Sequence, residues 1–165
     1  MSEQITNVPF ATSMLTMKVY LSVVEIGNNI KENIKKKIAH QVEGKCIKEG
    51  YIMKNSVEVV TFSAGKINME NVEFEVVYKC DICLPVKSMV IECLTKTITK
   101  AGIKAEYIVD NEPVMTVFIS RDDNYDNEEF LKVKTSNVSI FAKIIGVSYE
   151  LNDTTITVMA DLVVV

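Results

Sequence analysis

The sequence predicts a mostly β protein of the α+β class, in which one main helix belongs to an N-terminal unit and a small closed barrel follows. Three observations favour this fold class. Most apolar runs are short, rich in β-branched and aromatic residues, and bounded by turn residues. Residues 28–40 instead repeat their apolar side chains every four positions, as a helix does. From residue 72 onward, short strand-like segments follow one another at regular spacing, which is typical of sandwiches and barrels.

The N-terminal unit is predicted to run strand, helix, strand, strand. Residues 1–13 are polar and irregular, so we expect a loose extension. Residues 14–26 are rich in β-branched and aromatic side chains and predict a strand. After the helix, two further strands are expected within 41–53 and 56–62, and a turn or loop over 64–70.

The helix is the clearest single element in the sequence. Ile30, Ile34 and Ile38 lie four residues apart and form one apolar face. Asn29 suits the N-cap, and Glu32, three residues later, completes the pattern of a capping box. We therefore expect an amphipathic helix that packs its isoleucines against the strands of its own unit.

The C-terminal half is predicted to be almost entirely β. One long polar connection, residues 121–137, interrupts it and is expected to hold a helical turn near Glu128–Leu131. Five strands with one such insertion indicate a small closed barrel of the OB kind. No Gly/Ser-rich linker separates the two units near residues 79–84, so we expect a rigid rod. The candidate strands are 72–83, 87–98, 103–108, 114–119, 137–149 and 154–164.

Composition and charge limit the classes of function that the chain can have. The 165 residues are 48% hydrophobic and 24% charged, enough to bury the core of one ordinary domain or two small ones. Residues 1–79 carry ten lysines and nine glutamates, for +1, whereas residues 80–165 carry eight basic and thirteen acidic groups, for −5. Because affinity for nucleic acid follows the phosphates neutralised, any such contact is expected to be local and weak.

No targeting or membrane-spanning segment is expected. The apolar runs fall short of the roughly 20 residues that cross a bilayer. The N-terminus also lacks the basic block and apolar stretch of a secretory signal. We therefore expect an intracellular protein without a membrane contact.

The search for catalytic chemistry leaves no candidate site. The glycine-rich motifs that cradle phosphates are absent. A pairing of His40 with Cys46 as base and nucleophile is conceivable, but a structural role is preferred. Asp122, Asp123 and Asp126 resemble half a calcium loop without its glycine and closing glutamate. The sequence predicts no catalytic residue, no metal and no cofactor, and favours a binding or assembly protein.

The cysteines are expected to be buried and reduced. Cys80 and Cys83 have the spacing of a zinc-binding pair, but the chain has no second pair and only one histidine. They also fall in a predicted strand, where residues three apart point to opposite faces. Buried thiols are therefore preferred over a metal site for all four cysteines, which are Cys46, Cys80, Cys83 and Cys93.

Two stretches carry a resemblance to a known family. In residues 30–52 a helix is followed by Val42-Glu43-Gly44 and then by a loop that ends in Gly50-Tyr51. The second stretch runs from residue 76 to residue 123, and its most specific tetrapeptide is Phe118-Ile119-Ser120-Arg121. In this order they resemble the stalk subunit of multisubunit DNA-dependent RNA polymerases, the family of the eukaryotic seventh subunit and the archaeal E subunit.

The resemblance is collinear over roughly residues 14–165, and residues 142–162 are similar to the closing strands of the family's barrel. It implies a tip domain over 14–79, of the truncated RNP-like kind, and an S1-like OB-fold domain over 80–165. The chain departs from the family at the turn that opens the barrel, reduced here to Pro85-Val86-Lys87-Ser88-Met89, and in the shorter region 62–75.

The resemblance implies a docking role for the first unit. In the family, a tip loop plugs the stalk into the polymerase core near the clamp. Two glycines allow a tight backbone path into a pocket, and Ile47 and Tyr51 would supply apolar anchors. An ordinary hairpin is the alternative. The candidate loop residues are Gly44, Lys45, Ile47, Glu49, Gly50 and Tyr51.

The resemblance also implies a weak contact between the barrel and nascent RNA. OB barrels bind single strands on aromatic side chains above a basic groove. For Phe118 and Phe141, core packing is preferred over base stacking. The RNA candidates are Lys87, Lys96, Lys100, Lys104, Tyr107 and Arg121.

Arg121 is the only arginine in the chain and follows a predicted strand. Its planar fork can bind a transcript phosphate. It can equally form a local ion pair with the acidic loop of Asp122, Asp123 and Asp126. We prefer the ion pair because the surrounding charge is negative.

The resulting hypothesis is a non-catalytic stalk subunit of an RNA polymerase. Its partners would be the large core subunits and single-stranded RNA, and a second stalk subunit is left open. Abundant lysine, isoleucine and asparagine suit an AT-rich genome, such as that of a large DNA virus. The expected location is the nucleus for a cellular protein, and a cytoplasmic viral factory or the virion for a viral one. The alternatives are a free-standing S1/OB single-stranded RNA-binding protein and a small enzyme that uses Cys46 or Cys93.

Overall fold

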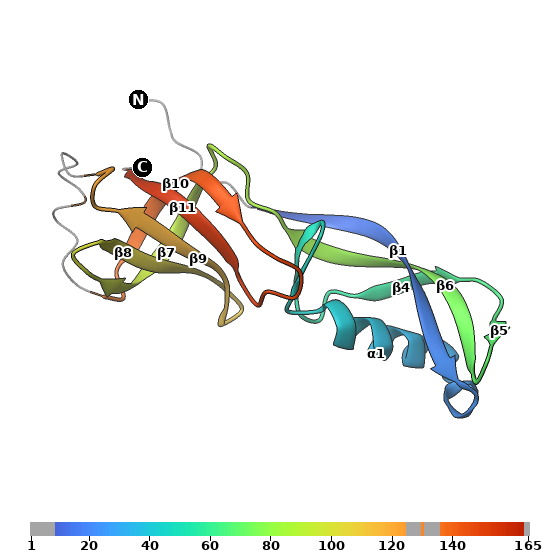
Figure 1. Cartoon of the computed structure of the whole chain (residues 1–165). Coiled ribbons are helices and arrows are strands. Elements are labelled where there is room, and N and C mark those ends of the chain that lie inside the picture. Colours follow the sequence, from blue (N-terminus) through green and yellow to red (C-terminus); the bar gives the residue numbers. More distant parts are fainter. Residues whose placement is uncertain (1–8, 125–129, 131–135, 164–165) are drawn as a thin grey trace.

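The computed structural model describes residues 9–124, 130 and 136–163. It shows a mostly β chain with one α-helix, an N-terminal sheet and a closed five-stranded barrel, so the predicted fold class is confirmed. The molecule is elongated, with the barrel at one end and the sheet and helix at the other (Figure 1). Among the described residues, no helix is long and apolar enough to cross a membrane.

The N-terminal sheet is built on two long strands. β1 (Phe10–Ser22) pairs antiparallel with β6 (Asn71–Cys83) over its whole length, without a bulge. The other edge of β6 is shared by three short strands in succession. β3 in turn pairs with β2. The short strands are β2 (Cys46–Ile47), β3 (Gly50–Ile52), β4 (Glu58–Phe62) and β5 (Lys66–Asn68).

Helix α1 (Ile30–Val42) covers one face of this sheet, as its amphipathic pattern predicts. Its buried side chains are Ile34, Ile38 and Val42, which join one core cluster with apolar residues of β1, β4 and β6. On the opposite face of the sheet no described helix lies over the strands, and the alternate residues of β1 are exposed.

Some predicted boundaries are wrong. β1 begins at Phe10, so residues 10–13 belong to the sheet and not to a loose extension, because they pair with the last residues of β6. The same strand ends at Ser22, and Val23–Glu25 form a 3₁₀ turn, η1, instead of more strand. Asn29 occupies the N-cap of α1 but makes no side-chain capping bond, so the expected capping box is absent there.

The barrel closes in the order β10-β11-β9-β8-β7, which is consistent with an OB fold. Its interior is filled by inward-facing residues of all five strands, such as Ile91, Ile103, Met115, Ile144 and Ile156. The helical turn predicted near 128–131 lies outside the described residues apart from Phe130. The barrel strands are β7 (Val90–Ile98), β8 (Gly102–Val109), β9 (Glu112–Ser120), β10 (Ser139–Ser148) and β11 (Ile156–Val163).

The two units meet through strand β6 and the β2–β3 hairpin. β6 runs past residue 80, where the sequence divides the chain, and ends at Cys83. Cys46, Tyr51 and Cys83 pack into the barrel's core cluster although they lie on strands of the N-terminal sheet. The barrel and the sheet therefore share apolar packing at their junction.

Candidate docking and nucleic-acid surfaces

The loop over residues 44–51 lies at the junction with the barrel. Gly44 and Gly50 have φ values of 72° and 137°, in the region that favours glycine. A Cβ at Gly50 would lie 2.6 Å from the Cys83 carbonyl oxygen. The two glycines thus allow a tight backbone path, as predicted, but the path closes the β2–β3 hairpin against β6.

Three hydrogen bonds hold this hairpin to the barrel. Cys46 donates its amide to the Asp153 carbonyl at 2.8 Å, and Asn152 donates its amide to the Cys46 carbonyl at 2.8 Å. The Tyr149 hydroxyl donates to the Lys48 carbonyl at 2.8 Å. Tyr51 is only 2% exposed. The barrel thus covers the Tyr51 side chain that the sequence offered as an apolar anchor.

The rest of the candidate loop is accessible to different degrees. Lys48 and Glu49 are exposed, whereas Lys45 and Ile47 are half-buried. The Lys45 ammonium donates to the His40 carbonyl at 3.2 Å. The loop thus presents two charged side chains to solvent, and no fully exposed apolar one.

Exposed apolar side chains lie instead on η1 and around β5. These two segments are at the end of the sheet far from the barrel (Figure 1). Val23, Val24, Ile67 and Met69 are 69%, 95%, 82% and 94% exposed, and we call them the distal apolar patch. Strand register brings the two segments together, because Ser22 pairs with Asn71 and Asn68 also pairs with Asn71. Sequence reasoning missed this patch because it assigned residues 23–26 to a strand.

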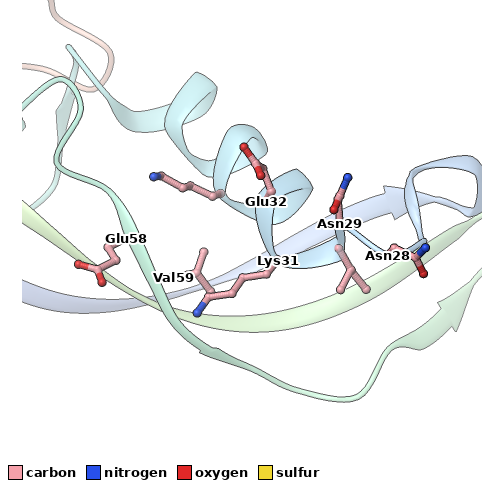
Figure 2. A pocket seen from close by; sticks show the side chains of 8 residues that line it. Asn28, Asn29, Lys31, Glu32, Glu58 and Val59 are labelled. Atoms are coloured by element: carbon pink, nitrogen blue, oxygen red, sulfur yellow. The ribbon is translucent and has the colours of Figure 1, made fainter.

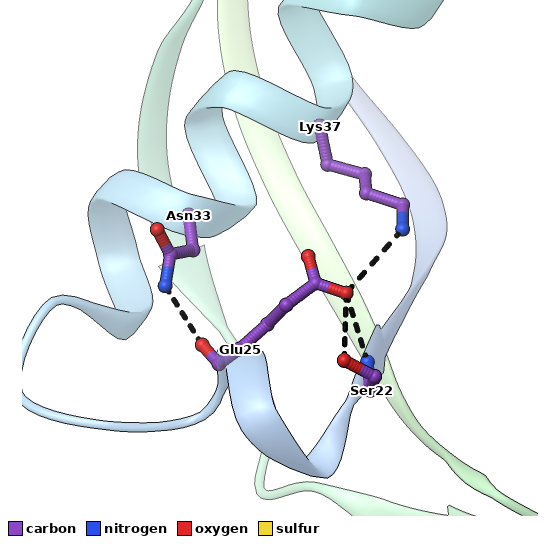
Figure 3. A network of polar contacts seen from close by, with 4 residues as sticks. All are labelled: Ser22, Glu25, Asn33 and Lys37. Carbon is purple, nitrogen blue, oxygen red and sulfur yellow. Dashed lines mark hydrogen bonds and ion pairs between the residues drawn. The ribbon is translucent and has the colours of Figure 1, made fainter.

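A polar network fixes the turn that carries Val23 and Val24 (Figure 3). The Glu25 carboxylate accepts hydrogen bonds from the Ser22 amide at 3.1 Å and the Ser22 hydroxyl at 3.0 Å. Asn33 of α1 donates to the Glu25 carbonyl at 2.7 Å, and Lys37 lies 3.9 Å from its carboxylate. The bonds from Ser22 hold the pKa of Glu25 below its ordinary value.

The RNA candidates of the barrel are spread over different regions. Lys100 and Lys104 are exposed on the β7–β8 hairpin, and Lys96 is half-buried at a bulge of the same hairpin. Lys87 lies in the turn between β6 and β7, where the amide of the adjacent Ser88 donates to β10. Tyr107 packs against Phe10, with ring centres 6.1 Å apart. The structure therefore groups Lys96, Lys100 and Lys104, but not Lys87 or Tyr107.

Arg121 contacts the rest of the protein through Nη2, whereas its Nε is buried without a hydrogen-bond partner among the described residues. Its Nη2 donates to the Thr99 carbonyl at 2.9 Å, and its guanidinium carbon lies 5.5 Å from the centre of the Phe130 ring. Within the described part of the chain, neither Asp122 nor Asp123 forms the expected ion pair with it. Asp126 lies outside the described residues. Arg121 fastens the β7–β8 turn to the end of β9.

Phe118 and Phe141 point away from the barrel interior, contrary to the expected core packing. Both are half-buried, and their strand neighbours Val117, Ile119, Ile140 and Ala142 fill the interior. Their strands alternate, so the residues between the interior positions face outward.

Strand pairing places Phe118 between a cation and a thioether on the outside of the barrel. It lies opposite Lys104 of β8 and beside Met159 of β11. We call these three residues the outer barrel strip. A flat aromatic side chain next to an exposed ammonium is the arrangement that stacks a base and neutralises a phosphate. Sequence analysis named Lys104 as a candidate but assigned Phe118 to the core.

The structure offers little to a catalytic interpretation. All four cysteines are buried and unpaired, and Cys80 and Cys83 belong to different core clusters. Among the described residues, no three His, Cys, Asp or Glu side chains lie together as a metal site requires. An open groove of about 440 Å³ beside the start of α1 presents amides, lysines and two carboxylates (Figure 2). Its described lining contains no serine, cysteine or histidine.

Comparison with known proteins gives one informative relative. No family model matches the chain. A protein of Acanthamoeba polyphaga mimivirus, named putative DNA-directed RNA polymerase subunit L376, is 26% identical over 161 residues. The match covers 88% of this chain and 77% of the mimivirus protein. The similarity therefore spans both the N-terminal sheet and the barrel.

Proposed function

We propose that the protein is a non-catalytic, stalk-type subunit of a DNA-dependent RNA polymerase, of the kind that large DNA viruses encode. The observation that carries the proposal is the similarity to the mimivirus protein, which extends over 88% of the chain. The fold supports it, since a sheet with one helix precedes a closed barrel in the order that the stalk family requires. In this proposal polymerisation belongs to the large subunits.

Docking to the core is proposed for the N-terminal unit. The distal apolar patch supports this, because exposed valine, isoleucine and methionine side chains gain free energy when a partner covers them. Residues 44–51 keep a smaller part in the proposal, through the exposed charges of Lys48 and Glu49. The elongated shape holds the barrel away from the patch, as a stalk requires (Figure 1).

Weak contact with emerging single-stranded RNA is proposed for the barrel. The outer barrel strip supplies one stacking surface, and Lys96, Lys100 and Lys104 supply positive charge on the adjoining hairpin. The net charge of the chain, −4, keeps this contact local. The location follows the polymerase: viral factory or virion for a viral enzyme, nucleus for a cellular one.

Purification of the tagged chain from its source, with mass spectrometry of the co-purifying proteins, tests the assignment. We expect the large polymerase subunits to co-purify. The double variant Val24→Asp, Met69→Asp should lose them, because it places two carboxylates in the distal apolar patch. Leu151→Asp is the matched control, since Leu151 is 70% exposed in a loop of the barrel. Absence of large subunits from the wild-type sample would refute the proposal.

A free-standing S1/OB single-stranded RNA-binding protein is the second candidate. The outward position of Phe118 beside Lys104 favours it, because that pair needs no polymerase to bind RNA. The same purification separates the two candidates. A free-standing protein would bring down RNA without large polymerase subunits.

A further inference from the structure

Among the described strands, β1 has a pairing partner along one edge only. It pairs with β6 from Phe10 to Ser22, and no other described strand pairs with it. In an antiparallel pair, alternate residues direct their amide and carbonyl groups away from the partner. Roughly half of the thirteen residues of β1 therefore present unpaired backbone groups at this edge.

The half of β1 nearest the barrel lacks the features that protect edge strands. Residues 10–17 contain no charged side chain and no proline, and the pairing with β6 has no bulge. Lysines, prolines, bulges and short length are the usual means by which edges avoid pairing with other chains. A long, uncharged, regular edge is the kind that accepts a further strand.

An apolar groove lies over the same half of the strand. Ala11 and Ser13 are small, whereas Leu15 and Val19 are larger on the same face of β1, so the sheet is left hollow near the barrel. The hollow has a volume of about 340 Å³. Its wall includes Leu84, which is 42% exposed. The groove is lined by Pro9, Phe10, Ala11, Ser13, Leu15, Glu49, Ile82, Leu84 and Met89.

We propose that an extended segment of another protein adds to this edge as a strand. Its backbone pairs with Phe10–Met17, and one long aliphatic side chain, leucine or isoleucine, enters the groove over Ala11 and Ser13. Cross-strand neighbours lie about 5 Å apart, so a residue opposite Ser13 reaches the groove directly. Residues on the other face of the segment lie beside Thr12, Met14 and Thr16 on the solvent-exposed face of the sheet, where polar side chains are favoured.

A second copy of the chain fits this edge less well. Two copies pair edge to edge only in antiparallel orientation about a two-fold axis. If residues 10–16 of the two strands overlapped, the last six residues of each β1 would extend about 20 Å past the other's Phe10. That stretch carries its own sheet and helix, and it would run beside the other copy's barrel. A single extended segment brings no such bulk.

The inference does not depend on the polymerase assignment, and its test uses peptides. A displayed library of random peptides about as long as β1 is selected against the immobilised full chain. We expect the enriched peptides to alternate aliphatic and polar residues without proline. Added to the labelled protein, a selected synthetic peptide should slow amide hydrogen exchange within residues 10–17. No enrichment, or protection confined to other residues, would overturn the proposal.

Two neighbouring variants of β1 provide the specific control. Ser13→Glu places a charge in the groove, whereas Met14→Glu places one on the outer face, where Met14 is already 60% exposed. We expect Ser13→Glu to lower the affinity for the selected peptide at least about tenfold, and Met14→Glu to lower it by less than about threefold. Equal losses would overturn the proposal, as would a concentration-dependent dimer that the peptide does not dissociate.

Discussion

Lys104 on β8 lies directly opposite Phe118 on β9, on the outside of the barrel. This pair joins a stacking surface to a positive charge, so each residue should contribute to RNA binding in a different way. Phe118→Ala should weaken the binding of a short oligouridylate by about 1–3 kcal/mol, which is the usual contribution of one stacked base. Lys104→Ala should instead lower the slope of log affinity against log salt concentration by about one, because one phosphate contact is lost. Fluorescence anisotropy at several salt concentrations measures both effects.

Phe141→Ala is the control for this prediction. Phe141 is also half-buried on the outside of the barrel, but its cross-strand partner on β7 is Glu92. The Glu92 carboxylate repels the phosphates of RNA, so we do not expect a base to stack on Phe141. Removal of the Phe141 ring should therefore leave the RNA affinity unchanged. If Phe118→Ala and Phe141→Ala lowered the affinity for RNA equally, the outer barrel strip would not be the binding surface.

The position of Phe118 shows why sequence alone could not identify this surface. β9 is apolar at both alternating positions, since Val114, Met115, Val117, Phe118 and Ile119 follow one another with only one polar interruption. Alternation therefore predicts a strand but does not say which side faces the interior. Only closure of the barrel, with β9 between β8 and β11, directs Val117 inward and Phe118 outward.

The candidate docking loop shows a different limit. The glycines at 44 and 50 correctly predict a tight backbone path. What the path contacts depends on Tyr149, Asn152 and Asp153, about a hundred residues further along the chain. Contacts of that sequence separation leave no local pattern. The helix, by contrast, is predictable because its isoleucines repeat within a single segment.

Arg121→Lys should destabilise the fold even though it keeps the charge. A lysine cannot reproduce the planar fork that donates to the Thr99 carbonyl while it faces the Phe130 ring. We expect a loss of about 1–2 kcal/mol in the free energy of unfolding, measured by urea titration. RNA affinity should change little. A variant of wild-type stability with weakened RNA binding would instead favour a phosphate contact for Arg121.

Tyr149→Phe should loosen the junction between the barrel and the β2–β3 hairpin. The variant removes the hydroxyl that donates to the Lys48 carbonyl and leaves the ring in place. We expect a loss of about 0.5–1.5 kcal/mol and faster amide exchange in residues 46–52. Tyr20→Phe is the matched control, because the Tyr20 hydroxyl makes only an exposed 3.4 Å contact with Glu73. Equal effects of the two variants would contradict a holding role for Tyr149.

Glu25→Gln should disturb the distal apolar patch without unfolding the protein. The Glu25 carboxylate is stabilised as an anion by the Ser22 amide and hydroxyl, and its pKa is lowered. A carboxyl group with a lowered folded pKa contributes stability above its ordinary pKa of 4.5 and loses that contribution as the pH falls. We therefore expect the protection of the amides of residues 22–25, measured as the exchange rate relative to the intrinsic rate at the same pH, to fall at acidic pH in the wild type. In Glu25→Gln this protection should be low at both acidic and neutral pH.

The cysteines should be inert to alkylation in the folded protein. Burial raises the pKa of Cys46 and Cys80 to about 11, and that of Cys83 and Cys93 to about 12. Because the thiolate is the nucleophile, iodoacetamide at neutral pH should modify none of them until the chain unfolds. One rapidly modified thiol in the native protein, detected by mass spectrometry, would revive an enzyme that uses Cys46 or Cys93.

The raised pKa values of the cysteines also predict how the free energy of unfolding changes at alkaline pH. Each folded pKa lies above the ordinary value of 9.0, so the folded state favours the neutral thiol. That stabilisation is complete below about pH 9, where thiols of the unfolded chain are also neutral, and is lost as the pH rises toward the folded values. Urea titrations should therefore give a constant free energy of unfolding from neutral pH to about pH 8, and a fall above about pH 9. Cys93→Ala removes one of these thiols, so the free energy of unfolding of this variant should fall less steeply above about pH 9. A fall as steep as that of the wild type would contradict thiol ionisation as the cause.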